Sequence, residues 1–359
     1  MYLSLGSLAQ NPSAPRPLPL PAPRLHFSAS TSSLAMAALI TNLLAALSLS
    51  STRQDQRPVR IPTITIGHDI DGVPVDMPLI GAGTWQYNDT IAYESVCKSF
   101  AAGYTFVDTA FGYGNQEGVG RAIKDCWHGS REDLFVMTKI PGGLSAAETL
   151  DTHVQNLDQL GLDYVDHVMT HFPADWKQTP ERSSKQRRQE EWVALENLYY
   201  RGLTRSIGFS HYCPRHIDDV MEVATVQPSV NQVEYHVGSG DLDDVMDKCQ
   251  KEGIYFMSFS PLCGPCQLTD PSDSLINGEL VTDVARKHGV LGAQVSLRFI
   301  VQQALESGSF VGSVIPKSNN LEHILSNMDI FSFELDDKDM ARLSRAKQPA
   351  GEGGDCDVA

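Results

Sequence analysis

The sequence predicts an α/β fold in which eight parallel strands, alternating with helices, close into a (β/α)8 barrel preceded by a β-hairpin. Short apolar runs alternate with segments of helical period from Ile61 onward. Asp108, Lys139 and His171 each stand at the end of one such run, and successive members are about 30 residues apart, the length of one strand–helix–strand repeat. Because the carboxyl ends of parallel strands lie at the same end of a barrel, its mouth, this spacing brings the three ionisable side chains together there.

The predicted hairpin comes before the barrel strands. Residues Thr63–Ile66 and Val73–Val75 flank Asp71 and Gly72, a dipeptide typical of tight turns between antiparallel strands. We expect this hairpin to lie at the bottom of the barrel, at the end opposite the ionisable side chains.

The barrel strands are predicted from eight apolar runs. These are residues 78–83, 105–107, 134–138, 165–170, 205–209, 229–233, 255–259 and 312–315. Helical periodicity predicts helices over residues 90–101, 146–160, 190–200, 242–251 and 275–287. This alternation favours a closed TIM barrel. The alternative, an open doubly wound sheet, would carry a dinucleotide fingerprint, and the segment from Gly112 to Gly114 lacks its third glycine.

The helix predicted over residues 146–160 shows how the helical boundaries are assigned. Val154, Leu157 and Leu160 are expected to share its buried face. Gly161 follows directly and is expected to end the helix, because glycine readily adopts the left-handed conformation of a helix C-terminus.

Composition limits the partners that the chain can bind. Its 359 residues carry 28 Lys and Arg against 44 Asp and Glu, a net charge of −16. This balance disfavours a sequence-independent grip on nucleic acid, so we expect a small-molecule substrate and no nucleic-acid partner. The seven cysteines are odd in number and scattered, which argues against a disulfide framework and for a reducing compartment.

The first 60 residues differ in composition from the rest of the chain. No Asp or Glu precedes Asp55, and the apolar run 34–49 is too short and too polar for a stable membrane span. Two interpretations remain open: a segment that targets an organelle, or a disordered extension upstream of Met36 on a cytoplasmic protein. We therefore expect an N-terminal extension (1–60), a barrel (61–347) and a flexible acidic tail (348–359).

The side chains at the predicted rim suit one kind of chemistry. A phenol such as Tyr113 loses its proton near pH 10, which is too high for a good general acid at neutrality. The ammonium of Lys139 would lower that pKa, the carboxylate of Asp108 would hold the ammonium in place, and His171 would orient a substrate oxygen. The matching reaction is hydride addition to a carbonyl carbon, which requires a nicotinamide cofactor.

Seven motifs, in order along the chain, resemble those of the aldo-keto reductase family. The segment from Asp108 to Glu117 is similar to the family signature around its catalytic Asp and Tyr. The other motifs are residues 136–139, 166–173, 205–210, 231–236, 260–262 and 314–318. The resemblance extends over residues 61–347.

The resemblance implies a carbonyl reductase that uses NADPH, with NADH as the second choice. Tyr113 would be the proton donor, assisted by Asp108, Lys139 and His171. We expect a monomer and no metal site. The cofactor-binding residues implied by position are Thr84, Ser210, Gln232, Phe259, Ser260, Lys317, Ser318 and Asn327.

The implied cofactor residues have different roles. Ser210 and Gln232 would bind the nicotinamide carboxamide. Lys317 and Ser318 would hold the adenosine 2′-phosphate, for which charge-assisted hydrogen bonds are suited. Asn327 would contact the adenine.

Three residues depart from the family pattern. His211 replaces the usual Asn after the fifth strand, and Phe259 replaces the Tyr that stacks on the nicotinamide. His323 replaces an Arg that often binds the 2′-phosphate, which weakens the expected preference for NADPH. Trp85 and Phe172 either line the substrate pocket or only pack at the rim.

Two further questions stay open at this level. Cys263 and Cys266 have the spacing of a redox pair, although a loop rich in Gly and Pro explains them better. A regulatory protein that binds the cofactor with little turnover is the alternative to an enzyme. The short acidic tail after Gln348 favours small aldehydes, sugars or keto acids over large ketones as substrates.

Overall fold

The computed structural model describes residues 60–175, 180–264, 268, 270–306, 308–351 and 356. The predicted N-terminal extension, apart from Arg60, lies outside the described residues, as do Cys266 and most of the predicted acidic tail. Within the described ranges, no helix is both long and apolar enough to cross a membrane.

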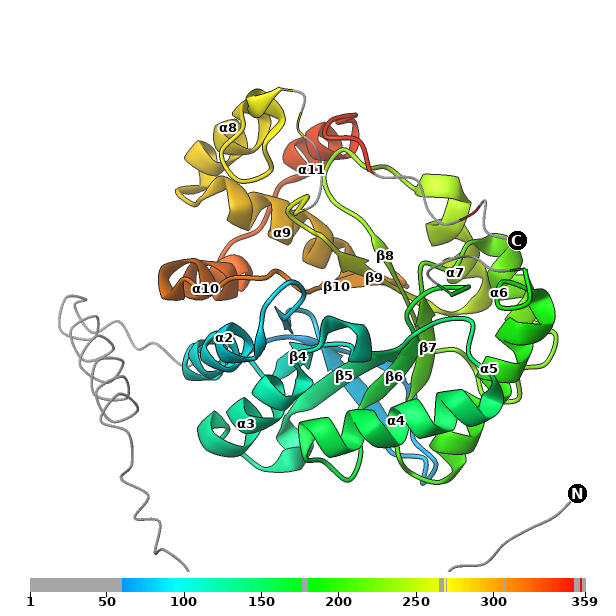
Figure 1. The fold of residues 1–359 in the computed structure, drawn as a ribbon. Coiled ribbons are helices and arrows are strands. Elements are labelled where there is room, and N and C mark those ends of the chain that lie inside the picture. Colours follow the sequence, from blue (N-terminus) through cyan, green and yellow to red (C-terminus); the bar gives the residue numbers. More distant parts are fainter. Residues whose placement is uncertain are drawn as a thin grey trace, which may run out of the picture. The chain divides into compact units, whose positions relative to one another are not determined.

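The barrel is a parallel sheet of eight strands that follow one another in chain order from β3 to β10 (Figure 1). A parallel bridge between Ile80 and Val314 joins the first strand region to the last and closes the sheet. The (β/α)8 prediction is confirmed, although the first strand is much shorter than the predicted run 78–83. The strands are β3 (Ala82–Gly83), β4 (Phe106–Asp108), β5 (Phe135–Ile140), β6 (His167–Thr170), β7 (Ile207–Ser210), β8 (Val230–Glu234), β9 (Tyr255–Phe259) and β10 (Val311–Val314).

Helices surround the strands (Figure 1). The segment predicted as a helix over 242–251 divides into a short turn at Leu242–Asp244 and helix α7, because the positive φ values of Asp243 and Asp244, 56° and 57°, interrupt a right-handed helix. The helix predicted from residue 275 begins later, after Gly278. The helices are α2 (Asp89–Ala101), α3 (Gln116–Cys126), α4 (Ala146–Leu160), α5 (Lys185–Tyr200), α6 (Pro214–Met221), α7 (Val245–Glu252), α8 (Glu279–His288), α9 (Gly292–Ala304), α10 (Leu321–Met328) and α11 (Asp337–Ser344).

Helix α4 has the predicted bounds but not the predicted face. Gly161 ends it in the left-handed conformation, with a φ of 66°. Val154, expected to be buried, is 44% exposed, and His153 is buried beside Leu157 and Leu160 instead. His153, Leu157 and Leu160 are separated by four and then three residues. This spacing matches the helical period better than the two steps of three that start from Val154. The ring of His153 lies 3.1 Å from the Leu203 carbonyl oxygen, and burial lowers its pKa to about 4.

The predicted hairpin is confirmed. Strand β1 (Thr63–His68) pairs antiparallel with β2 (Pro74–Pro78). Met77 of the hairpin packs in one apolar cluster with Phe106 and Phe135, which begin strands β4 and β5. The hairpin therefore closes the amino end of the barrel and leaves the carboxyl end to the loops.

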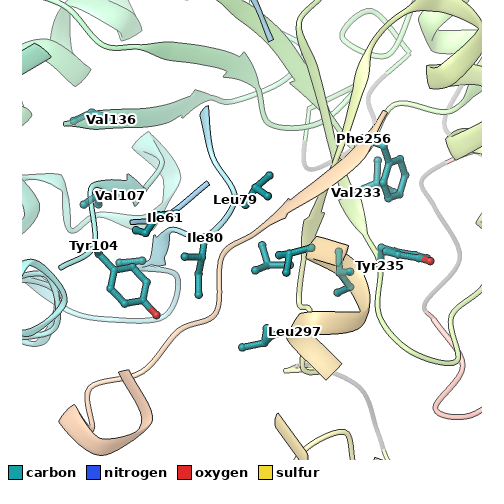
Figure 2. Close-up of a cluster of buried hydrophobic side chains, with 14 of the residues drawn as sticks. Ile61, Leu79, Ile80, Tyr104, Val107, Val136, Val233, Tyr235, Phe256 and Leu297 are labelled. Atoms are coloured by element: carbon teal, nitrogen blue, oxygen red, sulfur yellow. The ribbon is translucent and has the colours of Figure 1, made fainter. Parts of the chain in front are cut away.

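The main hydrophobic core lies between the strands and the surrounding helices. Figure 2 shows part of this core, where Leu79, Ile80, Val107 and Val136 are fully buried and Leu297 comes from α9. Burying one such aliphatic side chain contributes about 1.5–3 kcal/mol to folding. This packing fixes the strands, so the residues at their carboxyl ends are held in a rigid frame.

The expectation that the chain has no disulfide framework is wrong. Cys97 of α2 is bonded to Cys126 of α3, and Cys213, before α6, is bonded to Cys356 near the C-terminus. The partners are 29 and 143 residues apart in sequence, and the fold brings their Cα atoms to 5.3 and 5.5 Å. The two disulfides could not be predicted from the sequence, because their cysteines are far apart in the chain. Cys263 is also disulfide-bonded, although the sequence favours a loop without a disulfide there, and the question of a redox pair with Cys266 stays open because Cys266 lies outside the described residues.

Candidate active site

The four side chains expected at the rim lie together at the carboxyl ends of neighbouring strands. Asp108 is the last residue of β4, Lys139 lies one residue before the end of β5, and His171 directly follows β6. Tyr113 ends a 3-10 turn in the loop after β4. The strand order alone therefore gathers a carboxylate, an ammonium, an imidazole and a phenol at one place.

Lys139 and Asp108 form a fully buried ion pair. The ammonium Nζ lies 2.7 Å from both carboxylate oxygens of Asp108, and the two residues are 0% and 1% exposed. The ammonium also donates to the Thr109 carbonyl oxygen at 3.1 Å and to the Tyr113 hydroxyl at 3.3 Å. Burial lowers the pKa of Lys139, and the attraction of Asp108 opposes that shift.

The pKa of Tyr113 moves in the opposite direction from the one expected. Burial, and then the negative charge of Asp108, raise the pKa of the phenol well above its ordinary value. The nearby ammonium of Lys139 does not outweigh these two effects. The hydroxyl is therefore held protonated, the state that a proton donor requires, and an alkoxide is a strong enough base to take that proton.

His171 is held at the rim by its backbone and by ring packing. Its N–H donates to the Ile140 carbonyl oxygen at 2.7 Å. Its ring is stacked on Phe172 at 4.5 Å and lies edge-on to the Tyr113 ring at 5.5 Å between centroids. Burial, followed by the charges of Lys139 and His211, lowers the pKa of His171 well below its ordinary value. The imidazole is therefore neutral and can hydrogen-bond a carbonyl oxygen.

Gln232 and Ser210 bind protein groups in this structure. The side-chain amide of Gln232 donates to Asp108 Oδ2 at 3.0 Å, and its Nε2 lies 3.5 Å from the sulfurs of Met137 and Met257. The Ser210 hydroxyl donates to the Gln232 carbonyl oxygen at 2.7 Å. Gln232 is thus a further partner of the Asp108 carboxylate. Its role toward a nicotinamide stays a prediction.

An aromatic wall lies beside the four side chains. The ring of His211 lies 4.5 Å from that of Phe172 and 4.7 Å from that of Phe259. His211 has a positive φ of 60°. Asn adopts this backbone conformation more readily than most residues, which explains why the family pattern has Asn at this position. Ser260, after Phe259, also has a positive φ, of 49°. The wall gives the mouth an apolar side that a flat ring or a small carbonyl compound can contact.

The residues expected around an adenosine 2′-phosphate lie in the loop that follows β10. The Lys317 ammonium donates to Gln86 Oε1 at 2.7 Å and lies 5.1 and 6.0 Å from the ring centres of Tyr87 and Trp85. Trp85 itself is 44% exposed. Ser318 follows Lys317, two residues before the N-cap of α10. An ammonium, a hydroxyl and a helix N-terminus together fit a phosphate group.

Two other predicted cofactor residues are buried near this loop. Asn327 is 5% exposed and lines a hollow together with Gly83, Pro316 and Ser318. The Thr84 hydroxyl donates to the Asp108 carbonyl oxygen at 2.9 Å, which connects the first strand to the ion pair. Asn327 and Ser318 thus line one small hollow, and their roles toward a nucleotide stay predictions.

Sequence reasoning missed several residues that shape the site. Gln86 contacts Lys317, and Ser95 and Lys98 of α2 hydrogen-bond to the loop that follows β10. The only signal in the sequence is two polar residues three apart on one helix, a pattern common on exposed helix faces.

Comparisons with known proteins agree with this geometry. A sequence model of the aldo/keto reductase family matches residues 79–348. The chain is 34% identical over 271 residues to glyoxal reductase from Bacillus subtilis, with 75% of this chain and 88% of that protein covered. It is 32% identical over 296 residues to a probable NAD(P)H-dependent D-xylose reductase from Emericella nidulans, with 75% and 90% covered.

A solved structure supports the same assignment. An aldo/keto reductase from Brucella melitensis has a TM-score of 0.66 and 31% identity to this chain, with 80% of this chain and 99% of that chain covered. The sequence match, the relatives and the barrel all indicate one family. The chain belongs to the aldo/keto reductase family and is an NAD(P)H-dependent oxidoreductase.

Proposed function

We propose that the protein reduces a small aldehyde or ketone with NADPH and that Tyr113 donates the proton. The observation that carries this proposal is the buried chain in which Asp108 binds Lys139 at 2.7 Å and Lys139 binds the Tyr113 hydroxyl at 3.3 Å. The cofactor, when bound, supplies the hydride. Tyr113 gives its proton to the carbonyl oxygen as negative charge develops, and the Lys139 ammonium stabilises the phenolate that remains.

His171 orients the carbonyl oxygen toward Tyr113 in this proposal. A neutral imidazole 5.5 Å from the phenol ring, centre to centre, supplies a hydrogen bond without adding a second positive charge beside Lys139. This arrangement supports reduction of a neutral carbonyl group. The transferred proton then comes from Tyr113, whose raised pKa keeps its hydroxyl protonated.

The loop after β10 supports NADPH over NADH. Lys317, Ser318 and the N-terminus of α10 supply positive charge and donors for a 2′-phosphate, although His323 is a weaker anion partner than Arg.

The aromatic wall supports a small substrate. In this wall the ring centre of His211 lies 4.5 Å from that of Phe172 and 4.7 Å from that of Phe259. The relatives above are named for glyoxal and D-xylose, both small oxygen-rich carbonyl compounds. We propose that small aldehydes, sugars or keto acids are the substrates.

Replacing Tyr113 by Phe tests the proposal. Steady-state NADPH oxidation is measured with glyoxal, D-xylose and an aromatic aldehyde, and the NADPH Kd is measured by fluorescence titration. Loss of the proton donor should lower kcat by about 10²–10⁴-fold. The Kd should change by less than about twofold, because the hydroxyl does not bind the nucleotide. A variant as active as the parent would refute the role of Tyr113. Tight NADPH binding by the parent without any turnover would instead indicate a regulatory binding protein.

A further inference from the structure

Helix α2 is attached to the loop that follows β10 by two of its side chains. The Ser95 hydroxyl donates to the Ser318 carbonyl oxygen at 2.8 Å. The Lys98 ammonium donates to the Asn319 carbonyl oxygen at 2.8 Å and to Asn319 Oδ1 at 2.7 Å. These contacts join residues more than 220 positions apart, at the loop where a 2′-phosphate would be held.

The position of α2 makes these contacts rigid. Ser95 and Lys98 are three residues apart and therefore lie on one side of the helix, where Ser95 is 2% exposed and Lys98 is half-buried. Cys97, between them in sequence, is bonded to Cys126 of α3. Helix α2 is thus fixed to its neighbour on one side and to the loop on the other.

The attachment determines where the backbone donors of the loop point. In a planar trans peptide the C=O and the following N–H point in opposite directions. Because α2 holds the carbonyls of Ser318 and Asn319, the N–H groups of Asn319 and Asn320 are turned away from α2. The N–H of Asn320 donates to Ser318 Oγ at 3.1 Å, which also fixes that hydroxyl.

Lys98 also brings an unneutralised charge to the loop. Both of its hydrogen-bond acceptors belong to Asn319, an uncharged residue. Within the described part of the chain, no carboxylate forms an ion pair with Lys98. Its positive charge therefore adds to that of Lys317 and favours an anion at this loop.

We propose that Lys98, with Ser95, is a positioning residue that sets the affinity of the loop for the 2′-phosphate and so the preference for NADPH over NADH. This inference rests on the proposed function. Lys98 lies behind the loop and acts through Asn319, so it affects recognition of the nucleotide and not the chemical step.

The test compares two small nucleotides that carry no nicotinamide. Adenosine 2′,5′-bisphosphate contains the 2′-phosphate and 5′-AMP does not. Their binding to the full chain is measured by isothermal titration for the parent and for Lys98→Met. Loss of a charged hydrogen-bonding group should weaken the bisphosphate about tenfold and 5′-AMP less than about twofold.

Lys124→Met is the matched control. Lys124 is an exposed lysine on α3, so its replacement changes the net charge equally without touching the loop. It should leave both affinities within about twofold of the parent. Lys98→Arg, which keeps the charge, should recover part of the lost affinity. In steady-state assays Lys98→Met should raise the KM for NADPH and leave kcat nearly unchanged.

The outcomes separate this inference from the proposed function. Equal weakening of both nucleotides, or no weakening by Lys98→Met, would overturn the role of Lys98 while the parent still reduces carbonyl compounds. If Lys98→Met does not fold, Ser95→Ala decides, with an expected loss of about threefold for the bisphosphate alone. A parent protein that binds neither nucleotide nor NADPH would overturn the proposed function and this inference together.

Discussion

A buried aspartate lies at each end of the barrel, and the two are bound in different ways. At the amino end, Asp166 accepts from Arg131 at 2.8 Å, from Arg205 at 3.2 Å and from the Val136 N–H at 2.9 Å. At the carboxyl end, Asp108 shares one ammonium with the Tyr113 hydroxyl.

The two charge pairs serve different purposes. The two guanidinium groups stay charged at any ordinary pH, and their side chains are 20% and 23% exposed, so Asp166 is satisfied without any group that could move a proton. Asp108 is paired instead with Lys139, whose pKa is lowered, and that lysine binds a phenol whose pKa is raised. Similar charge pairs thus stabilise the fold at one end and support acid–base chemistry at the other.

The largest expected effect comes from removing the shared ammonium. Lys139→Met should lower kcat by about 10²–10⁴-fold, because the phenolate left after proton transfer loses its stabilising charge. The fold should persist, because the side-chain amide of Gln232 still donates a hydrogen bond to Asp108. Steady-state kinetics and circular dichroism check both parts. If the variant keeps the parental kcat, the ion pair at the carboxyl end of the barrel has no catalytic role that the one at the amino end lacks.

The corresponding change at the amino end should act on stability alone. Asp166→Asn should lower the free energy of unfolding by about 2–4 kcal/mol, because it leaves two arginines without their buried partner. Urea denaturation measures the loss, and kcat per folded molecule should match the parent. Asp108→Asn is the matched substitution at the carboxyl end, and there the larger loss should be in kcat. A reversal of this pattern would contradict the comparison.

A smaller, pH-dependent effect should come from His167, which lies between the two ends. Its Nδ1 is 2.7 Å from the Ser206 hydroxyl oxygen, and that hydroxyl donates to the Asp166 carbonyl oxygen. Burial, and then the charge of Lys139, lower the pKa of His167 from 6.5 to about 3. The unfolded chain therefore takes up a proton first as the pH falls. The stability that neutral His167 provides is complete above pH 6.5 and is lost toward pH 3.

This pH effect is measured by urea denaturation at two pH values. By about pH 5, the loss attributable to His167 should reach about 2 kcal/mol. His167→Asn keeps a hydrogen-bonding group near Ser206 but does not titrate, so its stability should fall less between about pH 7 and about pH 5. Identical losses in parent and variant would show that His167 does not titrate as expected.

The barrel, the hairpin and the proximity of Asp108, Tyr113, Lys139 and His171 could all be predicted from the sequence. Strand and helix periodicity are local properties, and parallel strands of one repeat length must end at one rim. The order of the motifs then indicated the family without any knowledge of contacts.

Contacts between distant residues, and the electrostatic effects of burial, became visible only in the folded chain. The packed barrel pairs Cys97 with Cys126, raises the pKa of Tyr113 and attaches Lys98 to Asn319. None of these follows from local pattern, because each depends on a neighbour far away in the chain or on the amount of water around a group. Burial and long-range proximity are properties of the packed barrel, and they set the electrostatics of its mouth.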